Sequence, residues 1–366
     1  MKWLNDYRTR LMFIGVVAAL VFVGVSAKAD FTFGPPVNLG PTVNSQHNEL
    51  TACVSADGLE LYYMYGGIWE PNEQWDLSVS TRPTVEDDWG PPTNLGAVVN
   101  SPNNDDMGPC ISSDGLELYF QSSRPGGAGL DDIWVTRRAT KDDPWGEPEN
   151  LGPPVNTETW DYNPCLSADG LEFYFAYGLD PRLAVTKRDT KDSPWKEPVD
   201  LGSVVNNWTC QDTPWISSDG LVLMFTDFWI CDPRPGGLGS TDIWFTKRAT
   251  KDDDWGEPVN LGTPVNTEFA EDACMISADG STLYFNSDRP GGYGTYDLYQ
   301  APIIPIVDLN GDGIVDADDM CIMVDHWGEN YPLCDIGPMP WGDGIVDVQD
   351  LIVLAEHLFE EVPPVE

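Results

Sequence analysis

The sequence predicts an all-β propeller of five four-stranded antiparallel blades, followed by a small α-helical domain. Two short phrases recur at intervals of 50 to 60 residues, and the composition changes after residue 301. The first phrase, S-[AS]-D-G, begins at Ser55, Ser112, Ser167, Ser217 and Ser277. The second, [ND]-L-G, ends at Gly40, Gly96, Gly152, Gly202 and Gly262. Repetition at this spacing is typical of a supersecondary unit that stacks on copies of itself.

Each copy contains four short strand patterns. In the second copy "LELYF" at 116–120 follows a D-G turn, which is a common start of a hairpin. "PCIS" at 109–112 lies before that turn, and "DIWVTRR" at 132–138 and "WGEPENLG" at 145–152 lie after it. Four antiparallel strands in each of five copies are typical of a propeller.

The two ends of the repeat region predict how the ring closes. "FGPPVNLG" at 33–40 supplies an outer strand before the first complete copy. The last copy ends at "YDLYQAP", 296–302, with no outer strand after it. Pairing these two segments removes two exposed sheet edges, so we expect a closed propeller over residues 30–301.

The N-terminus predicts export. Residues 1–29 have a basic start, an apolar run at 11–25 and the sequence A-K-A before Asp30, as in a cleaved signal peptide. We therefore expect a secreted protein in the extracellular space or at the cell surface. No later stretch is long and apolar enough to span a membrane. The eight cysteines permit disulfides in an exported chain, but the spacing does not define their connectivity.

The net charge argues against nucleic acid as a partner. The whole chain has 19 basic and 60 acidic residues. Residues 1–29 hold four of the basic and one of the acidic residues, so the mature chain has 15 and 59, a formal charge of −44. Such a chain repels phosphate backbones.

Most repeated charged residues are expected to support the scaffold. The turn aspartates of the S-[AS]-D-G phrase fit hydrogen bonds to their own turn. The arginines of the R-P-G-G segments are expected to pair with aspartates eight residues later. These pairs are Arg124 with Asp132, Arg234 with Asp242, and Arg289 with Asp297.

A second set of acids is predicted at one mouth of the propeller channel. Eight residues before each turn aspartate stand Glu49, Asp106, Asp161, Gln211 and Glu271, with Asp212 beside the glutamine and Trp160 beside Asp161. Carboxylates with an aromatic ring suit a sugar or a cation, and close carboxylates raise one another's pKa. Glu49, Asp106, Asp161, Asp212, Glu271 and Trp160 are therefore candidate ligand-binding residues. Two alternatives remain: each acid caps the start of a strand and is solvated, or two of them form a catalytic pair.

One long pattern of the repeat resembles a known family. S-x-D-G-x-x-[LI]-[YF]-[FY] followed by S-x-R-P-G-G-x-G-x-x-D-[IL]-[WY] stands at 112–134, 217–244 and 277–299. It is similar to the WD-repeat-like propeller repeat of the TolB type, over about residues 33–300. Copies one and three lack the R-P-G-G segment. The family is functionally diverse, so the resemblance implies the fold and not an activity.

After the connector at 302–307, the segment "DLNGDGIVDADD" at 308–319 fits a calcium-binding loop. Its predicted ligands are Asp308, Asn310, Asp312, Ile314 through its carbonyl, Asp316 and Asp319. Gly313 fits the sharp turn of such a loop. The following helix is expected to bury the stripe Met320, Met323, Val324 and Trp327.

A second, partial copy follows in "WGDGIVDVQD" at 341–350. Its predicted ligands are Asp343, Ile345, Asp347 and Asp350. Met339 and Trp341 stand where the first and third ligands are needed, and neither binds calcium through its side chain. Asp335, before a proline-containing insertion, is the alternative first ligand.

Two calcium loops, each followed by one helix, resemble a type I dockerin over residues 308–360, before a tail at 361–366. The resemblance implies calcium as a cofactor and docking to a cohesin-like domain or a cell-surface scaffold, often in polysaccharide breakdown. The positions by which dockerins choose partners hold Ala317-Asp318 and Val348-Gln349, and not the hydroxylated pair of the best-known cohesin binders. Intramolecular stabilisation is the alternative role of this domain.

These observations favour an exported adaptor, with a propeller that binds glycan or protein and a tail that docks. The alternative is a glycoside hydrolase with acids at the channel mouth, and a third interpretation is a structural envelope protein. Hydrolysis needs carboxylates in different roles. The repeated acids look equivalent from blade to blade, which favours binding over catalysis.

Overall fold

The structure is a computed structural model. It describes residues 31–366 apart from 67–73, 209, 228–230, 311, 330, 332, 338, 340–341, 343 and 361–366. The signal-peptide prediction for 1–29 lies outside the described residues. The chain divides into two compact units, one of Phe33–Ile304 and one that includes the residues from Pro305 onward. In the part of the chain described, no helix is both long and apolar enough to cross a membrane.

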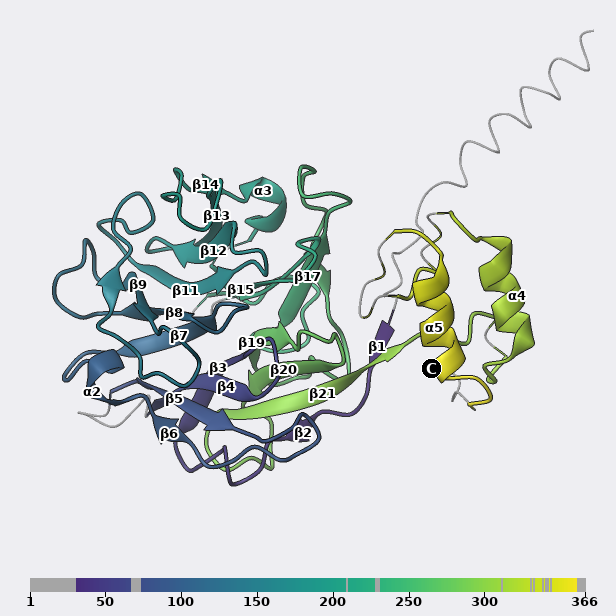
Figure 1. The fold of residues 1–366 in the computed structure, drawn as a ribbon, viewed down its shortest axis with the longest axis horizontal. Helices are drawn as coiled ribbons and strands as arrows, with labels where there is room; N and C mark the ends of the chain where they lie inside the picture. Colours follow the sequence, from purple (N-terminus) through teal and green to yellow (C-terminus); the bar gives the residue numbers. More distant parts are fainter. Residues whose placement is uncertain are drawn as a thin grey trace, which may run out of the picture. The chain divides into compact units, whose positions relative to one another are not determined.

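Five antiparallel sheets make up the first unit and confirm the predicted five-bladed propeller (Figure 1). Blade 1 contains β3 (Asn48–Val54), β4 (Glu60–Gly66), β5 (Asp76–Thr81) and β6 (Thr93–Asn94), and blade 2 contains β7 (Asp106–Ile111), β8 (Glu117–Ser122), β9 (Asp132–Arg137) and β10 (Glu149–Asn150). Blade 3 contains β11 (Asp161–Leu166), β12 (Glu172–Tyr177), β13 (Arg182–Lys187) and β14 (Val199–Asp200). Blade 4 contains β15 (Gln211–Ile216), β16 (Val222–Asp227), β17 (Ile243–Lys247) and β18 (Val259–Asn260). Short helices α2 (Gly96–Val99) and α3 (Gly202–Val205) follow the outer strands of blades 1 and 3.

The fifth blade closes the ring as predicted. It contains β19 (Glu271–Ile276), β20 (Thr282–Ser287) and β21 (Asp297–Pro305), and the N-terminal strands β1 (Phe31–Phe33) and β2 (Val37–Asn38) both pair with β21. The innermost strands contact one another in a closed cycle, β3–β7–β11–β15–β19–β3. Since β21 runs to Pro305, a strand occupies the first part of the interval that was predicted as a connector.

The blades hold together through an apolar core between them. In the strand segment "LELYF", the consecutive residues Tyr119 and Phe120 are 1% and 0% exposed. Neighbouring blades cover both faces of each sheet, so both sets of side chains leave water. Burying one such aromatic side chain stabilises the fold by roughly 2 kcal/mol.

The turn ends of blades 1, 2 and 3 each form an ion pair with the next blade. Asp114 accepts hydrogen bonds from Ser112 Oγ (2.7 Å) and Leu116 N (3.1 Å), as the scaffold prediction requires. Lys191 of the following blade also reaches Asp114 (3.2 Å). Equivalent links join Lys141 to Asp57 and Lys251 to Asp169. The repeated phrase therefore ties successive blades together.

The second unit is built from two similar halves. Helices α4 (Ala317–Asp325) and α5 (Val348–Glu356) each begin at a capping aspartate, and Met323 and Leu354 are fully buried between the halves. Val324 and Trp327 are 55% and 46% exposed, so the predicted buried stripe of the first helix is wrong at these two positions. Among the described residues of this unit, α5 is the one helix that packs against α4, so α4 buries fewer than the four predicted positions.

Of the cysteines, Cys210 and Cys231 form a disulfide in blade 4. Cys53, Cys110, Cys165, Cys274, Cys321 and Cys334 are free thiols. On the inner strands, Ile111 N donates to Cys53 Sγ (3.3 Å) and Leu166 N to Cys110 Sγ (3.2 Å). These two thiols therefore link one blade to the next.

Candidate functional site

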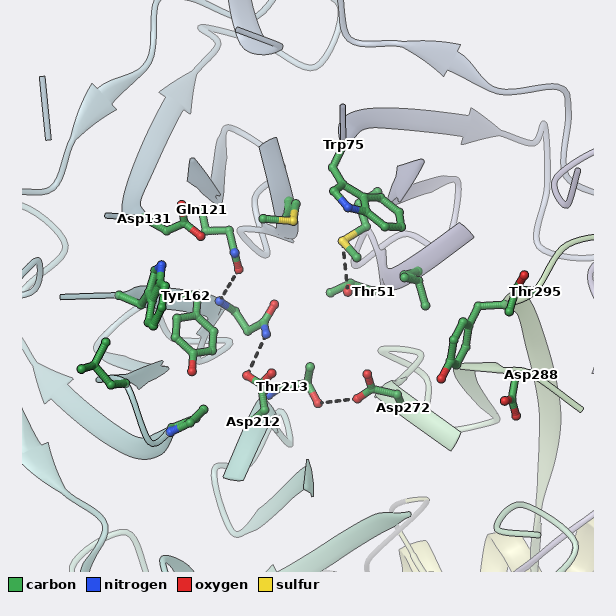
Figure 2. A pocket seen from close by; sticks show the side chains of 18 residues that line it. Thr51, Trp75, Gln121, Asp131, Tyr162, Asp212, Thr213, Asp272, Asp288 and Thr295 are labelled. Carbon is green, nitrogen blue, oxygen red and sulfur yellow. Dashed lines mark hydrogen bonds between the residues drawn. The ribbon is translucent and has the colours of Figure 1, made fainter. Parts of the chain in front are cut away.

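A cavity of about 680 Å³ lies where the inner strands of the five blades converge (Figure 2). From the inner strands it is lined by Leu50, Thr51, Met107, Tyr162, Asn163, Asp212, Thr213 and Asp272. The other lining residues include Trp75, Trp160 and Tyr296, which add aromatic surface, and Asp131 and Asp288. A mostly apolar cavity with a few polar groups is typical of a small-ligand site.

A β-bulge shapes this end of every inner strand. One residue of each bulge has a positive φ: Thr51 (53°), Gly108 (57°), Asn163 (49°), Thr213 (45°) and Ala273 (47°). The pairing of each inner strand shifts register at the same place. A left-handed conformation costs a non-glycine residue about 1 kcal/mol, and bulges commonly re-aim side chains beside functional sites. The repeated bulge therefore sets which side chains face the cavity.

Four of the predicted ligand-binding acids are buried away from the cavity. Glu49, Asp106, Asp161 and Glu271 are all 0% exposed, and none lines it. Each accepts a backbone N–H from the loop before its strand: Ser45 N to Glu49 (3.1 Å), Ser101 N to Asp106 (2.5 Å), Thr157 N to Asp161 (2.6 Å) and Thr267 N to Glu271 (2.7 Å). The prediction that these four face a ligand at the channel mouth is wrong. They cap the strand start, as the alternative expected, but they are buried and not solvated.

The arginines of R-P-G-G pair with other acids than predicted. Arg124 lies 2.5 Å from Asp106, and Arg289 lies 3.1 Å from Glu271. Asp132, the predicted partner of Arg124, instead accepts hydrogen bonds from Ala128 N and Gly129 N in the glycine-rich turn. In blade 4, Arg234 pairs with Asp227 (3.0 Å). The arginines therefore neutralise buried acids at the strand starts. An aspartate such as Asp132 instead binds the backbone of the glycine-rich turn.

Raised pKa values at these positions come from burial first. Burial raises the pKa of Glu49 to about 7 and that of Asp161 to about 6. The pKa of Asp106 is also raised by burial, although hydrogen bonds and Arg124 oppose the shift. Proximity between repeated carboxylates was the predicted cause of raised pKa values, but burial is the larger cause at these three acids.

Asp212 and Trp160 are the two candidate residues that line the cavity. Trp160 is 36% exposed, whereas Asp212 is 3% exposed. Asp272, one blade further, lines the cavity at the strand position equivalent to Asp212 and was not among the candidates. The same position holds Leu50, Met107 and Tyr162 in the first three blades. Asp272 could have been identified from the sequence, because it is an acid at a strand position that is apolar or aromatic in the first three blades.

Thr213 lies between the two cavity aspartates (Figure 2). Asp212 Oδ1 accepts hydrogen bonds from Thr213 N (2.8 Å) and Asn163 Nδ2 (2.7 Å). Asp272 Oδ1 accepts from Thr213 Oγ1 (3.2 Å), Thr226 Oγ1 (2.5 Å) and Ala273 N (2.7 Å). Burial, then the charge of Asp272, raises the pKa of Asp212 to about 7, and burial raises the pKa of Asp272 as well. The cavity therefore holds two carboxyl groups whose charge is costly at neutral pH.

In the first predicted calcium loop, side-chain oxygens gather around the turn at Gly313. Asp308 Oδ2 accepts from Gly313 N (2.8 Å), and Asn310 Oδ1 accepts from Asp312 N (2.7 Å). Asp316 caps α4 by accepting from Asp318 N, and Asp319 accepts from Leu309 N, Asn310 N and Asp316 N. Ile314 is 46% exposed. The oxygen-rich turn fits a hard cation such as calcium.

The second loop repeats this geometry with Asp335 in the place of Asp308. Asp335 Oδ2 accepts from Gly344 N (2.8 Å), and Asp350 Oδ1 accepts from Ile336 N and Gly337 N. Asp347 caps α5, and Ile345 is 51% exposed. Asp343 lies outside the described residues. Among the described residues, no three His, Cys, Asp or Glu side chains form a metal-binding cluster. Asp335, the alternative first ligand, has the position in the second loop that Asp308 has in the first.

Comparisons with known proteins identify similar solved structures but no family. No family model and no curated protein matches the chain. TolB from Acinetobacter baumannii is 13% identical, with 78% of this chain and 67% of that chain covered and a TM-score of 0.43. A thermostable family-43 glycoside hydrolase is 14% identical (72% and 91% covered, TM-score 0.47). The catalytic domain of a GH62 α-L-arabinofuranosidase from Coprinopsis cinerea is 10% identical (75% and 97% covered, TM-score 0.45).

Proposed function

We propose that the chain is an exported adaptor whose propeller binds a glycan in the central cavity and whose C-terminal unit, stabilised by calcium, docks to a cohesin-type partner. The single observation that carries the glycan proposal is the lining of the cavity. Aromatic rings of Trp75, Trp160 and Tyr296 offer faces for sugar rings, and carboxylates offer acceptors for hydroxyl groups.

Calorimetry tests the glycan proposal directly. The mature chain, with calcium, is titrated with cello-, xylo-, manno- and chito-oligosaccharides. Trp160→Ala is expected to weaken binding at least tenfold, because the ring lies in the cavity. Trp208→Ala is the matched control, since Trp208 is 37% exposed and does not line the cavity. Equal loss in both variants, or no binding of any saccharide by the wild type, contradicts the proposal.

Calcium binding in the C-terminal unit is supported by the repeated loop geometry. Asp308, Asn310 and Asp312 in the first loop and Asp335 in the second are the side chains that would hold the ion, with Asp319 and Asp350 organising the loop backbone. A bound ion would supply charge neutralisation and fix the loops. We expect EGTA to lower the unfolding temperature of this unit, and Asp308→Asn to weaken calcium affinity more than Asp325→Asn, a change at the helix end.

Docking is supported by apolar side chains on the two helices. Val324 and Trp327 near the end of α4, and Val348 and Ile352 on α5, are each at least 46% exposed. Exposed apolar residues on neighbouring elements are typical of a protein-binding surface. The cohesin-type partner is tested by calcium-dependent binding to immobilised cohesin domains. Binding that persists unchanged in EGTA contradicts a calcium-stabilised docking unit.

Glycoside hydrolysis is a second candidate, favoured by the pair Asp212 and Asp272. A carboxyl with a pKa of about 7 beside a second carboxyl is a typical general acid. Release of reducing ends by the wild type and not by Asp212→Asn would make the cavity an active site. If the wild type binds the saccharide and releases no reducing ends, the adaptor proposal stands.

A further inference from the structure

The cavity is acidic and contains no basic side chain. Four aspartates line it: Asp131, Asp212, Asp272 and Asp288. None of the 18 described residues that line the cavity is Lys, Arg or His. The propeller segments outside the described residues, 67–73, 209 and 228–230, have no such residue in their sequence either. The described residues that line the cavity therefore supply no side-chain cation to balance these carboxylates.

Asp212 and Asp272 each direct one carboxylate oxygen toward the protein, and no described residue donates a hydrogen bond to the other oxygen. All hydrogen bonds to these two carboxylates from the described residues end on Oδ1 (Figure 2). All donors are neutral amide or hydroxyl groups. Asp212 is 97% buried, since its exposed fraction is 3%. An ionised carboxylate at such a site is costly unless a cation accompanies it.

The aromatic surface of the cavity favours an organic cation as the ligand. The same cavity is lined by Trp75, Trp160, Tyr162 and Tyr296. Aromatic faces attract ammonium groups, most strongly where water is excluded. Carboxylates and aromatic rings together form the usual environment for a bound amine.

We propose that the cavity selects a ligand with a protonated amine, held at the Oδ2 atoms of Asp212 and Asp272, and that the ligand is an oligosaccharide of an amino sugar with free amino groups. The sugar part rests on the proposed glycan-binding function, whereas the amine part rests on the charges of the cavity. A volume of about 680 Å³ is within the range of small-ligand sites, which run from about 300 to 1,000 Å³.

Binding of the amine is expected to release protons near neutral pH. A cation beside Asp212 favours its ionised form, so a proton leaves the carboxyl when the amine binds. The other titratable groups at the cavity are Asp131, Asp272, Asp288, Tyr162 and Tyr296. Burial raises the pKa of Asp131 to about 6, so at pH 7 it adds negative charge. Titrations in two buffers of different ionisation enthalpy measure the number of protons released.

The decisive experiment compares three oligosaccharides of equal length by calorimetry at pH 7: a glucosamine oligomer, its N-acetylated form and a cello-oligomer. The full mature chain is used with calcium present. We expect the glucosamine oligomer to bind at least tenfold more tightly than either neutral oligomer. Asp212→Asn and Asp272→Asn should each remove at least tenfold of that preference, because each lowers the affinity for the glucosamine oligomer more than the affinity for the neutral oligomers.

A matched control separates the cavity from the overall charge. Asp142→Asn changes an exposed acid outside the cavity and lowers the net negative charge equally. We expect it to leave the preference for the amine intact. Equal binding of all three oligomers, or equal losses in Asp142→Asn and Asp212→Asn, overturns the amine inference and leaves glycan binding standing. No binding of any oligomer overturns both proposals.

Discussion

Two neighbouring positions on the inner strands behave in opposite ways. The first, the inner position, holds Glu49, Asp106, Asp161, Gln211 and Glu271, and all five are fully buried. The second, the cavity position, holds Leu50, Met107, Tyr162, Asp212 and Asp272, and all five line the cavity. The inner position is polar in every blade, whereas the cavity position changes character between blade 3 and blade 4. The position whose polar character repeats in every blade supports the scaffold, whereas the position whose character varies between blades forms the cavity.

The largest effect is expected from removing the partner of an acid at the inner position. Arg124→Met leaves the buried carboxylate of Asp106 without its cation, which typically costs about 3 to 5 kcal/mol. Denaturant unfolding of the full chain measures the loss. Adding Asp106→Asn should recover a large part of it, because the uncompensated charge is then gone.

The control is Arg137→Met, which removes an arginine that pairs at the surface with Glu117 and Glu149. Exposed ion pairs contribute less than about 1 kcal/mol. If Arg124→Met costs no more than Arg137→Met, the acid at the inner position does not depend on its ion pair.

The repeat made the fold predictable and the site less so. Periodic turns, strand patterns and a spare N-terminal strand were enough to predict five blades and their closure. The same periodicity directed attention to the inner position, because Glu49, Asp106, Asp161 and Glu271 recur at equivalent places. Spacing alone does not tell which of two adjacent strand residues faces the axis. The bulge at Thr51, Gly108, Asn163, Thr213 and Ala273 decides it, and no simple residue pattern marks that bulge.

The second prediction concerns the cavity position, where an acid is expected to reduce stability. The folded-state pKa of Asp212 is about 7, above its ordinary value of 3.8. The folded protein therefore keeps this proton where the unfolded chain has lost it. The associated stability is complete below about pH 4 and is lost as the pH rises through 7. Asp212→Asn should be more stable than the wild type at pH 8, by about 1 to 3 kcal/mol.

Denaturant unfolding at several pH values tests this sign. The difference between Asp212→Asn and the wild type should be near zero at pH 4 and grow up to pH 8. Asp142→Asn, an exposed acid, should show no such growth. A variant that loses stability at pH 8 would place Asp212 with the scaffold acids of the inner position.

The smallest effect is expected from the threonine that joins the two cavity aspartates. Thr213→Val keeps the shape and the β-branch at a positive φ but removes the hydroxyl that lies 2.6 Å from Thr226 Oγ1 and 3.2 Å from Asp272 Oδ1. We expect a loss of about 1 kcal/mol, because a buried hydroxyl bond is removed. The pKa of Asp272 should rise further in this variant, because the hydrogen bond from the Thr213 hydroxyl favours the ionised form of Asp272. Unfolding as a function of pH measures both changes.

Thr51→Val is the matched control, since Thr51 occupies the same bulge in blade 1 with a positive φ. Among the described residues, its hydroxyl donates to a weak acceptor, Met64 Sδ, at 3.7 Å. A loss below about 0.5 kcal/mol is therefore expected there. Equal losses in the two variants would mean that blade 4 is no more specialised than blade 1. A larger loss at Thr213, with a pH dependence absent at Thr51, would locate the functional difference between blades at the cavity aspartates.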